Sequence, residues 1–369
     1  MRFRTFTGHP ARLGFTACLV LVLHGSGLHA QTTLNPDISL IGDIRGGWHN
    51  DSNRPDEEDA FNLDLHEAEL AIQGYLNPYA RADIFFGWHE ETAAEIEELY
   101  FTLSRGLPLS MAVRAGRYLL PVGKINQTHP HAYSFIERPL SNLEFFGEEG
   151  LADVGIELSL PIPTGPLATT LAASVLKGDF LEGEEHAHAL AAQDEPSGEE
   201  RPNERAFGGR IETFVPTSEY GGLGIGLAGV TGVPHEDERR YIGGFDLKYR
   251  WKPDRYRSFT AGAEWLVNRA PLEHEEEENI TSHGFFGYVD HQFRQRYNVG
   301  AAGSWVQSAE NSDDQLWRIG GFAGYAPVEE TSLLRLLVSY EKDVSADHGF
   351  WSAALQLVFS LGPHQPHMF

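Results

Sequence analysis

Two stretches of the sequence contain the residue types that most readily bind a metal. The first, "EGEEHAHALAAQDEPSGEE" from position 182, contains Glu184, Glu185, His186 and His188. Imidazole and carboxylate are ligands that zinc takes in proteins. The same stretch is poor in aromatic residues and rich in Glu, Pro, Ser and Ala, which is typical of a mobile, solvated segment. Residues 179–203 are therefore interpreted either as an acidic mobile loop or as a surface site for Zn²⁺ or another divalent cation.

Catalytic constellations are much weaker in this sequence. No Ser, His and acidic residue occur at a spacing that indicates a hydrolase triad. The "GLGIG" run at 222–226 lacks the following helix and acidic residue that nucleotide binding requires. We therefore expect no enzymatic activity. We also expect no cofactor; the alternative is a bound Zn²⁺ or another divalent cation.

A third stretch combines apolar and charged residues over 121–150, "PVGKINQTHPHAYSFIERPLSNLEFFGEEG". A freely solvated loop has no need of its aromatic and aliphatic side chains, so they predict packing against another surface. The charged residues that such a packed segment would present are Lys124, His129, His131, Glu137, Arg138 and Glu144.

The elements that must position these residues are strands. The chain has 39 glycines, 11% aromatic residues and many stretches with apolar residues at every second position, which favours sheet over helix. About sixteen such stretches lie between residues 36 and 361. In "YRSFTAGAEWLVN" from 256, for example, Phe259 and Trp265 share a face opposite Glu264 and Asn268.

The connections alternate between short turns and longer, mostly acidic segments. This alternation is typical of an outer-membrane antiparallel β-barrel with short periplasmic turns and long acidic extracellular loops. A soluble sandwich has no reason to segregate its loops in this way. We therefore predict an all-β transmembrane barrel over 31–369, with the 121–150 segment folded inward as a constriction; the alternative for this segment is an extracellular lid. The residues expected to face the lumen on the strands are Arg81, Asp83, Glu98, Arg114, Glu264 and Arg335.

The first thirty residues predict a secretory signal peptide, residues 1–30. Three arginines precede and flank a short apolar run, and "GSGLHA" ends at a plausible cleavage point after Ala30. Loss of these three arginines, with no acid, changes the formal charge from −25 to −28. Such an acidic chain repels nucleic acid and attracts cations.

The sequence resembles a group of bacterial outer-membrane proteins related to the phosphate-selective porins. The resemblance rests on "LNPDISLIGDIRG", "HEAELAIQGYLNPYARADIFF", "AGRYLLPVGKINQTHPHAYSFIERPL" and "FFGEEGLADVGIEL", and is densest over 34–160. Members are often labelled zinc-regulated TonB-dependent outer membrane receptors, yet about 339 mature residues cannot supply both a plug and the 22 strands of such receptors.

Together these observations predict a porin-like channel for small hydrophilic solutes or ions in the outer membrane of a Gram-negative bacterium, with a preference for cations. A zinc-binding or uptake receptor at the surface is one alternative, and a barrel enzyme or structural protein is another. Expected partners are outer-membrane lipid and lipopolysaccharide, the permeating solutes, and the barrel-assembly machinery, which recognises a carboxy-terminal residue such as Phe369. No nucleic acid is expected, and a homotrimer is expected by analogy with general porins.

Overall fold

The computed structural model describes residues 36–53, 61–89, 94–181, 205–235, 238–271, 279–328 and 331–362. Within these residues the chain is built almost entirely of strands. The strands are β1 (Asp37–His49), β2 (Asn62–Asn77), β3 (Ala80–Trp88), β4 (Glu95–Leu103), β5 (Ala112–Leu119), β6 (Ala152–Thr164), β7 (Leu167–Leu176), β8 (Ala206–Ser218), β9 (Gly221–His235), β10 (Glu238–Asp254), β11 (Arg257–Pro271), β12 (Asn279–Phe293), β13 (Tyr297–Gln307), β14 (Gln315–Val328), β15 (Ser332–Asp343) and β16 (His348–Leu361). Among the described residues, no helix is long and apolar enough to cross a membrane.

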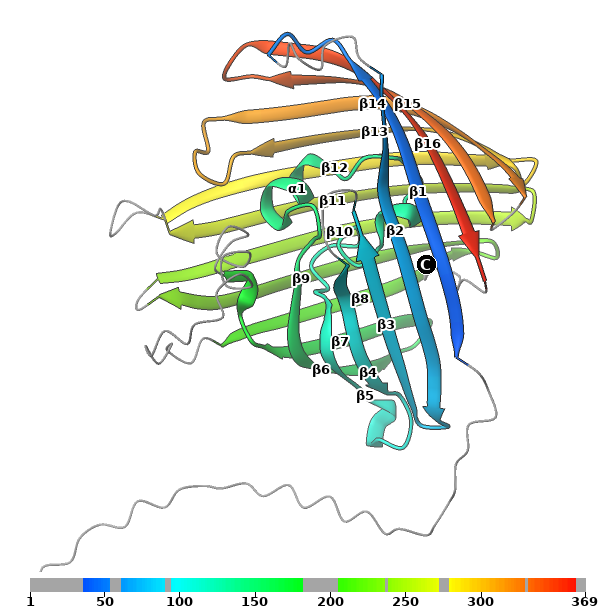
Figure 1. Ribbon diagram of the computed structural model, residues 1–369. Helices are drawn as coiled ribbons and strands as arrows, with labels where there is room; N and C mark the ends of the chain where they lie inside the picture. Colours follow the sequence, from blue (N-terminus) through cyan, green and yellow to red (C-terminus); the bar gives the residue numbers. More distant parts are fainter. Residues whose placement is uncertain are drawn as a thin grey trace, which may run out of the picture.

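The strands form one closed antiparallel barrel of sixteen members (Figure 1). Each strand pairs with its neighbours in sequence, and β1 closes the ring against β16 over ten residue pairs from Leu40↔Leu361 to His49↔Ser352. Closure leaves no unpaired sheet edge, which is the condition for a sheet to lie in lipid. The predicted fold class is confirmed.

The alternation of side chains separates an apolar outer face from a polar inner face. Ile156, Phe207 and Trp265 are half exposed on the outside of the barrel. Asp246, Glu264 and Arg335 are buried in the interior. An apolar outer face without a protein partner is what contact with lipid requires.

The connections alternate as predicted, with two local differences. The β9–β10 connection, which the alternation predicts to be one of the longer segments, consists of positions 236–237 alone. The β4–β5 connection, which the alternation predicts to be a short turn, extends from 104 to 111 and contains a 3₁₀ turn, η1 (Pro108–Ser110). Pro108 at the start of this turn fixes its own φ and donates no backbone hydrogen bond, which favours a turn over continuation of the strand.

The β5–β6 connection enters the barrel (Figure 1). It contains η2 (Pro130–Ala132) and a short helix, α1 (Leu140–Phe146), which contacts β12, β13 and β14. Its apolar side chains form the interior core: Leu140, Phe145 and Phe146 pack with Leu266 and Val306 of the wall. The interior of the barrel is thus filled in part by its own loop.

Candidate functional site: the β5–β6 loop inside the barrel

The first part of the 121–150 loop is held by Glu264 of β11. The carboxylate of Glu264 accepts hydrogen bonds from the backbone N–H groups of Lys124 and Ile125. Gly123 adopts φ +77°, and a Cβ at this position would lie 2.7 Å from Glu264 Oε2. Glycine is therefore needed both for the left-handed backbone and for the close approach to the carboxylate.

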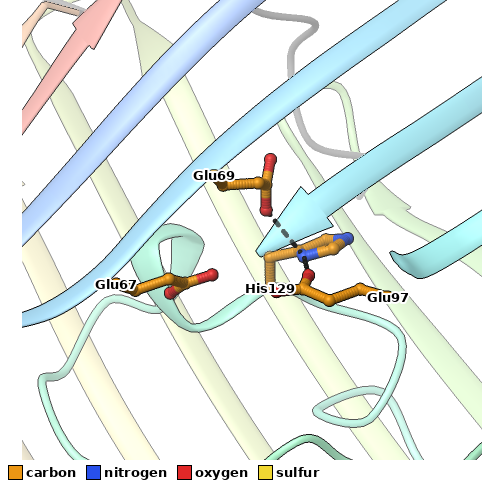
Figure 2. Close-up of side chains that lie close together, drawn as sticks. All are labelled: Glu67, Glu69, Glu97 and His129. Atoms are coloured by element: carbon orange, nitrogen blue, oxygen red, sulfur yellow. Dashed lines mark ion pairs between the residues drawn. The ribbon is translucent and has the colours of Figure 1, made fainter. Parts of the chain in front are cut away.

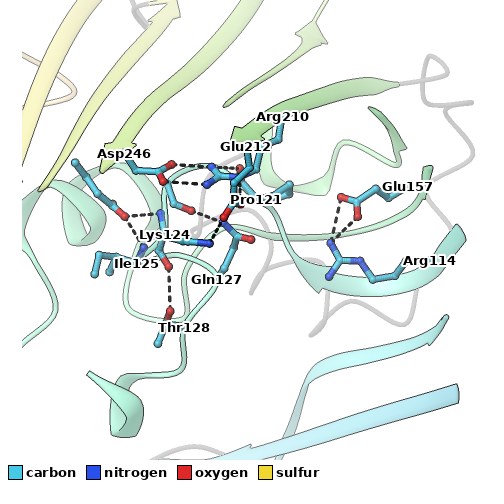
Figure 3. A network of polar contacts seen from close by, with 12 residues as sticks. Arg114, Pro121, Lys124, Ile125, Gln127, Thr128, Glu157, Arg210, Glu212 and Asp246 are labelled. Atoms are coloured by element: carbon cyan, nitrogen blue, oxygen red, sulfur yellow. Dashed lines mark hydrogen bonds and ion pairs between the residues drawn. The ribbon is translucent and has the colours of Figure 1, made fainter. Parts of the chain in front are cut away.

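Lys124 extends this anchor toward β8 through an ion-pair network (Figure 3). Its Nζ pairs with Glu212, and Arg210 Nε donates to Glu212 over 3.0 Å. Arg210 also forms a two-pronged pair with Asp246 at 2.7 and 2.9 Å and donates to the carbonyl of Pro121. Two-pronged pairs between arginine and carboxylate fix geometry as well as charge.

Arg335 of β15 holds the middle of the loop. Its guanidinium donates to the backbone carbonyls of Phe135 over 2.6 Å and His131 over 3.2 Å. The Phe135 ring packs against the rings of Phe286 and Tyr288, with centroids 4.9 and 5.2 Å apart. The hydrogen bonds of the buried Arg335 and the aromatic contacts of Phe135 together fix this part of the loop to the wall.

The last part of the loop lies against β13 and β14. Glu137 pairs with Arg318 at 2.9 Å. The carboxylate of Glu144 accepts from the backbone N–H of Ala309 over 2.6 Å. Arg138 instead donates to carbonyls of the loop itself, those of Gly147 and Glu148. Glu137 and Arg138, although adjacent, therefore point to different partners.

His129 is the centre of a compact acidic cluster against β2 and β4 (Figure 2). Its Nδ1 lies 2.9 Å from Glu69 Oε2 and 3.4 Å from Glu97 Oε2, while its Nε2 lies 3.0 Å from Glu98 Oε1. The ring stacks on Phe85 at 4.9 Å and on His131 at 5.7 Å. Burial alone lowers the pKa of His129, but the surrounding carboxylates, Glu69 foremost, outweigh burial and hold this pKa well above its ordinary value.

The structure brings several of the predicted residues together. His129 meets Glu98, Lys124 meets Glu264, and His131 meets Arg335 through its backbone carbonyl. The remaining predicted lumen residues pair along the wall, Arg81 with Asp83 at 2.6 Å and Arg114 with Glu157 at 3.1 Å. That these residues narrow a channel stays a prediction. Glu184, Glu185, His186 and His188 lie outside the described residues.

Three glutamates of the His129 cluster were not predicted as site residues from the sequence: Glu67, Glu69 and Glu97. The first two have the spacing of one face of β2 in "HEAEL", which is a usable signal. Glu97 is different, because the β3–β4 register shifts between Phe85 and Phe86, opposite Glu98 and Ile96. This bulge brings two successive glutamates, Glu97 and Glu98, to the same histidine.

Two of the cavities that border the loop differ in the charge of their lining. The larger, about 370 Å³, is lined by five basic residues and two acidic ones, Glu264 and Asp290, with neutral polar groups such as Ser134. The smaller, about 50 Å³, lies on the β2–β4 side, and its ionisable lining is mainly glutamate, including Glu67 and Glu97. The loop thus separates a basic from an acidic side of the barrel interior.

Comparisons with known proteins agree with this architecture. No protein-family model matches the chain. An uncharacterized protein of Aquifex aeolicus is 32% identical over 231 residues, which are 58% of this chain and 46% of that protein; the match thus spans about half the length of the relative.

Solved structures with a similar fold cover most of this chain. The outer membrane channel DcaP of Acinetobacter baumannii superposes with a TM-score of 0.57 at 12% identity, covering 89% of this chain and 99% of its own. The trimer form of OmpT, an outer membrane protein of Vibrio cholerae, gives 0.56 at 8% identity, with 89% and 100% covered. Pseudomonas putida OprB gives 0.53 at 10% identity, with 89% and 94% covered.

The chain therefore has the fold of an outer-membrane, porin-like β-barrel. The closed ring and its apolar outer face fit a lipid bilayer, and the similar solved structures come from the outer membranes of Gram-negative bacteria. The predicted localisation in that membrane is confirmed.

Proposed function

We propose that the protein is a porin-like channel through which small hydrophilic solutes or ions diffuse past the 121–150 loop. The observation that carries the proposal is the polar cavity of about 370 Å³ between this loop and the barrel wall. A closed barrel whose interior were only structural would have no need of charged groups such as Lys248 and Arg250 beside a cavity. The fold similarity to the DcaP channel supports the same function. The proposal includes no catalytic step.

The loop would act as the constriction because it is tied to the wall at several separate points. Glu264 holds its beginning, and Arg335 and Arg318 hold its middle, from three different strands. A loop fixed in this way keeps a pore of constant width instead of opening and closing as a lid. The predicted charged residues Lys124, Glu137 and Arg138 belong to this constriction in the proposal.

Cation preference is part of the proposal, and it rests on the acidic excess of the whole chain. The mature chain has 53 acidic residues against 25 basic ones once the three arginines of the leader are subtracted from 28. A mouth surrounded by carboxylates concentrates cations, although salt screens such charges over about 8 Å at physiological ionic strength. The basic lining of the large cavity acts in the opposite sense, so selectivity should be weak and greatest at low salt.

The test is a planar-bilayer recording on the purified mature protein. We expect stepwise currents, and a reversal potential of cation-selective sign across a potassium chloride gradient. Absence of stepwise currents would refute the channel itself. An anion-selective sign would retain the channel, refute the cation preference and assign control of permeation to the basic cavity.

The homotrimer also remains a proposal by analogy, and the trimer form of Vibrio cholerae OmpT supports it. Sedimentation of the protein in detergent should give the mass of three chains. The mass of one chain would refute this assembly.

A further inference from the structure

The His129 cluster has the composition and geometry of a metal site. One atom each of Glu67, Glu69, Glu97 and His129 lies within 4.8 Å of the corresponding atoms of the other three (Figure 2). Ligand atoms at about 2.1 Å from a tetrahedral zinc ion are about 3.4 Å apart, so side-chain movements of about 1 Å suffice to close the set around an ion. The ligands come from β2, β4 and the 121–150 loop, so an ion there would join the loop to the wall.

A second, independent observation comes from Glu67. Its side chain is buried, with 3% of the residue exposed, and Oε2 has no hydrogen-bond partner among the described residues. Burying a carboxylate oxygen without a partner is costly, and a cation is the partner that relieves the cost most directly. Neither Glu67 nor Glu97 forms an ion pair with a lysine or arginine within the part of the chain that the structure describes.

The surroundings of His129 are those of a metal-binding imidazole. Glu98 contacts Nε2 and leaves Nδ1 directed at Glu69 and Glu97. A carboxylate on the second ring nitrogen is the usual way in which a protein orients a histidine that binds a metal. Gly87 preserves space for the ligand set, because a Cβ at that position would overlap with the Glu97 carboxylate.

The cluster also has room for an ion. The cavity of about 50 Å³ is lined by Glu67, Glu97 and His129. This exceeds the roughly 10–15 Å³ needed to hold one water molecule. Further glutamates in the lining, Glu148 and Glu149, extend the acidic surface.

We propose that Glu67, Glu69, Glu97 and His129 form a binding site for a divalent transition-metal ion inside the barrel. The imidazole ligand favours an ion such as Zn²⁺ over Ca²⁺ or Mg²⁺, which take oxygen ligands. Binding at Nδ1 displaces to solvent the proton that this nitrogen shares with the carboxylates. The ion replaces that proton as the positive partner of the carboxylates and fixes the loop to β2 and β4. The site is made of other residues than the predicted ligands His186 and His188 and does not depend on channel activity.

The experiment is a calorimetric Zn²⁺ titration of the full mature barrel in detergent after treatment with a chelator. It uses a His186→Ala, His188→Ala background so that the acidic segment at 179–203 contributes no imidazole. We expect one Zn²⁺ per chain, with Ca²⁺ binding at least tenfold more weakly. X-ray absorption should show nitrogen or oxygen ligands at about 2.0–2.2 Å, together with the outer-shell scattering of one imidazole.

Substitutions then locate the site. Glu67→Gln and Glu97→Gln keep the shape of the side chain and should each weaken Zn²⁺ binding at least tenfold. The matched control is Glu157→Gln, which removes a carboxylate from the same interior where it pairs with Arg114, and should change the affinity less than twofold. Folding of each variant is checked by its heat-shifted electrophoretic mobility.

Two results would overturn the proposal. One is the absence of stoichiometric Zn²⁺ binding in the background variant. The other is the same affinity in folded Glu67→Gln, Glu97→Gln and Glu157→Gln.

Discussion

Arg335 is the residue whose replacement tests most sharply how the loop is held. Its side chain is buried and donates to two loop carbonyls, those of Phe135 and His131. Arg335→Met keeps much of the aliphatic volume but removes both hydrogen bonds and leaves two carbonyl groups short of a donor. We therefore expect the middle of the loop to leave the wall far more often.

The size of the effect follows from the two bonds. Hydrogen bonds from a charged donor contribute about 1.5–3 kcal/mol each, and the lower value is appropriate because removing a buried charge also relieves its desolvation. Two bonds then give about 3 kcal/mol, or an increase of about 150-fold in the released population.

The assay is limited chymotrypsin digestion of the barrel in liposomes, followed by mass spectrometry. Chymotrypsin cleaves after aromatic residues, so Tyr133 and Phe135, which are buried in the part of the loop that Arg335 holds, report on its release. The cleavage rate follows the released population when opening and closing are faster than cleavage. Arg335→Met should be cut at least tenfold faster than the parent protein.

The matched control is Arg114→Met. Arg114 lies in the same interior, but its partners are Glu157 and the rings of Tyr100 and Tyr118, all outside the 121–150 loop. It should leave the loop as protected as in the parent. Equal cleavage of the Arg335→Met variant and the parent, or equal acceleration by both substitutions, would refute the anchoring role.

Three further predictions concern the loop and the pore. Gly123→Ala should lower the free energy of unfolding by at least about 1–2 kcal/mol, because alanine is strained in the left-handed backbone conformation, and the clash with Glu264 adds to this loss. An unchanged urea midpoint of unfolding would contradict the need for glycine at this position. Glu137→Gln breaks the pair with Arg318 and should change single-channel conductance or shift the reversal potential, whereas no change in either would place this pair away from the permeation path. Raising potassium chloride from 0.05 to 1 M shortens the screening length roughly fourfold to fivefold and should reduce the cation preference; a preference independent of salt would rule out control by the acidic stretches.

The barrel was predictable because its signal is local and repeated. Alternation in stretches such as Ser258–Asn268 requires no knowledge of distant residues, and the lengths of the connections indicate where each strand reverses. The apolar residues of the 121–150 loop similarly indicated that it packs on something. The sequence could not show that Leu140–Phe146 forms a helix, because a helix of only about two turns depends on its contacts with β12–β14.

The His129 cluster could not be predicted from the sequence. Glu97 and Glu98 would face opposite sides of a regular strand, and only the bulge opposite Phe85 and Phe86 brings both to His129. The histidine itself is 31 positions from Glu98 and reaches it only because the loop turns inward. Register shifts and loop paths depend on tertiary contacts, and neither leaves a periodic pattern in the chain.

The central claim, that solutes pass between the loop and the wall, is tested most directly by a cysteine placed in the large cavity. The only cysteine of the chain, Cys18, lies in the predicted signal peptide, so one introduced thiol should be unique in the mature protein. Ser134→Cys places it on the loop in the cavity lining, and the control Val289→Cys places it on the outer face, where Val289 is 44% exposed. A cationic methanethiosulfonate reagent should lower the single-channel conductance of the Ser134→Cys variant and leave that of Val289→Cys unchanged. Unaltered conductance of fully modified Ser134→Cys channels would contradict a permeation path along this face of the loop.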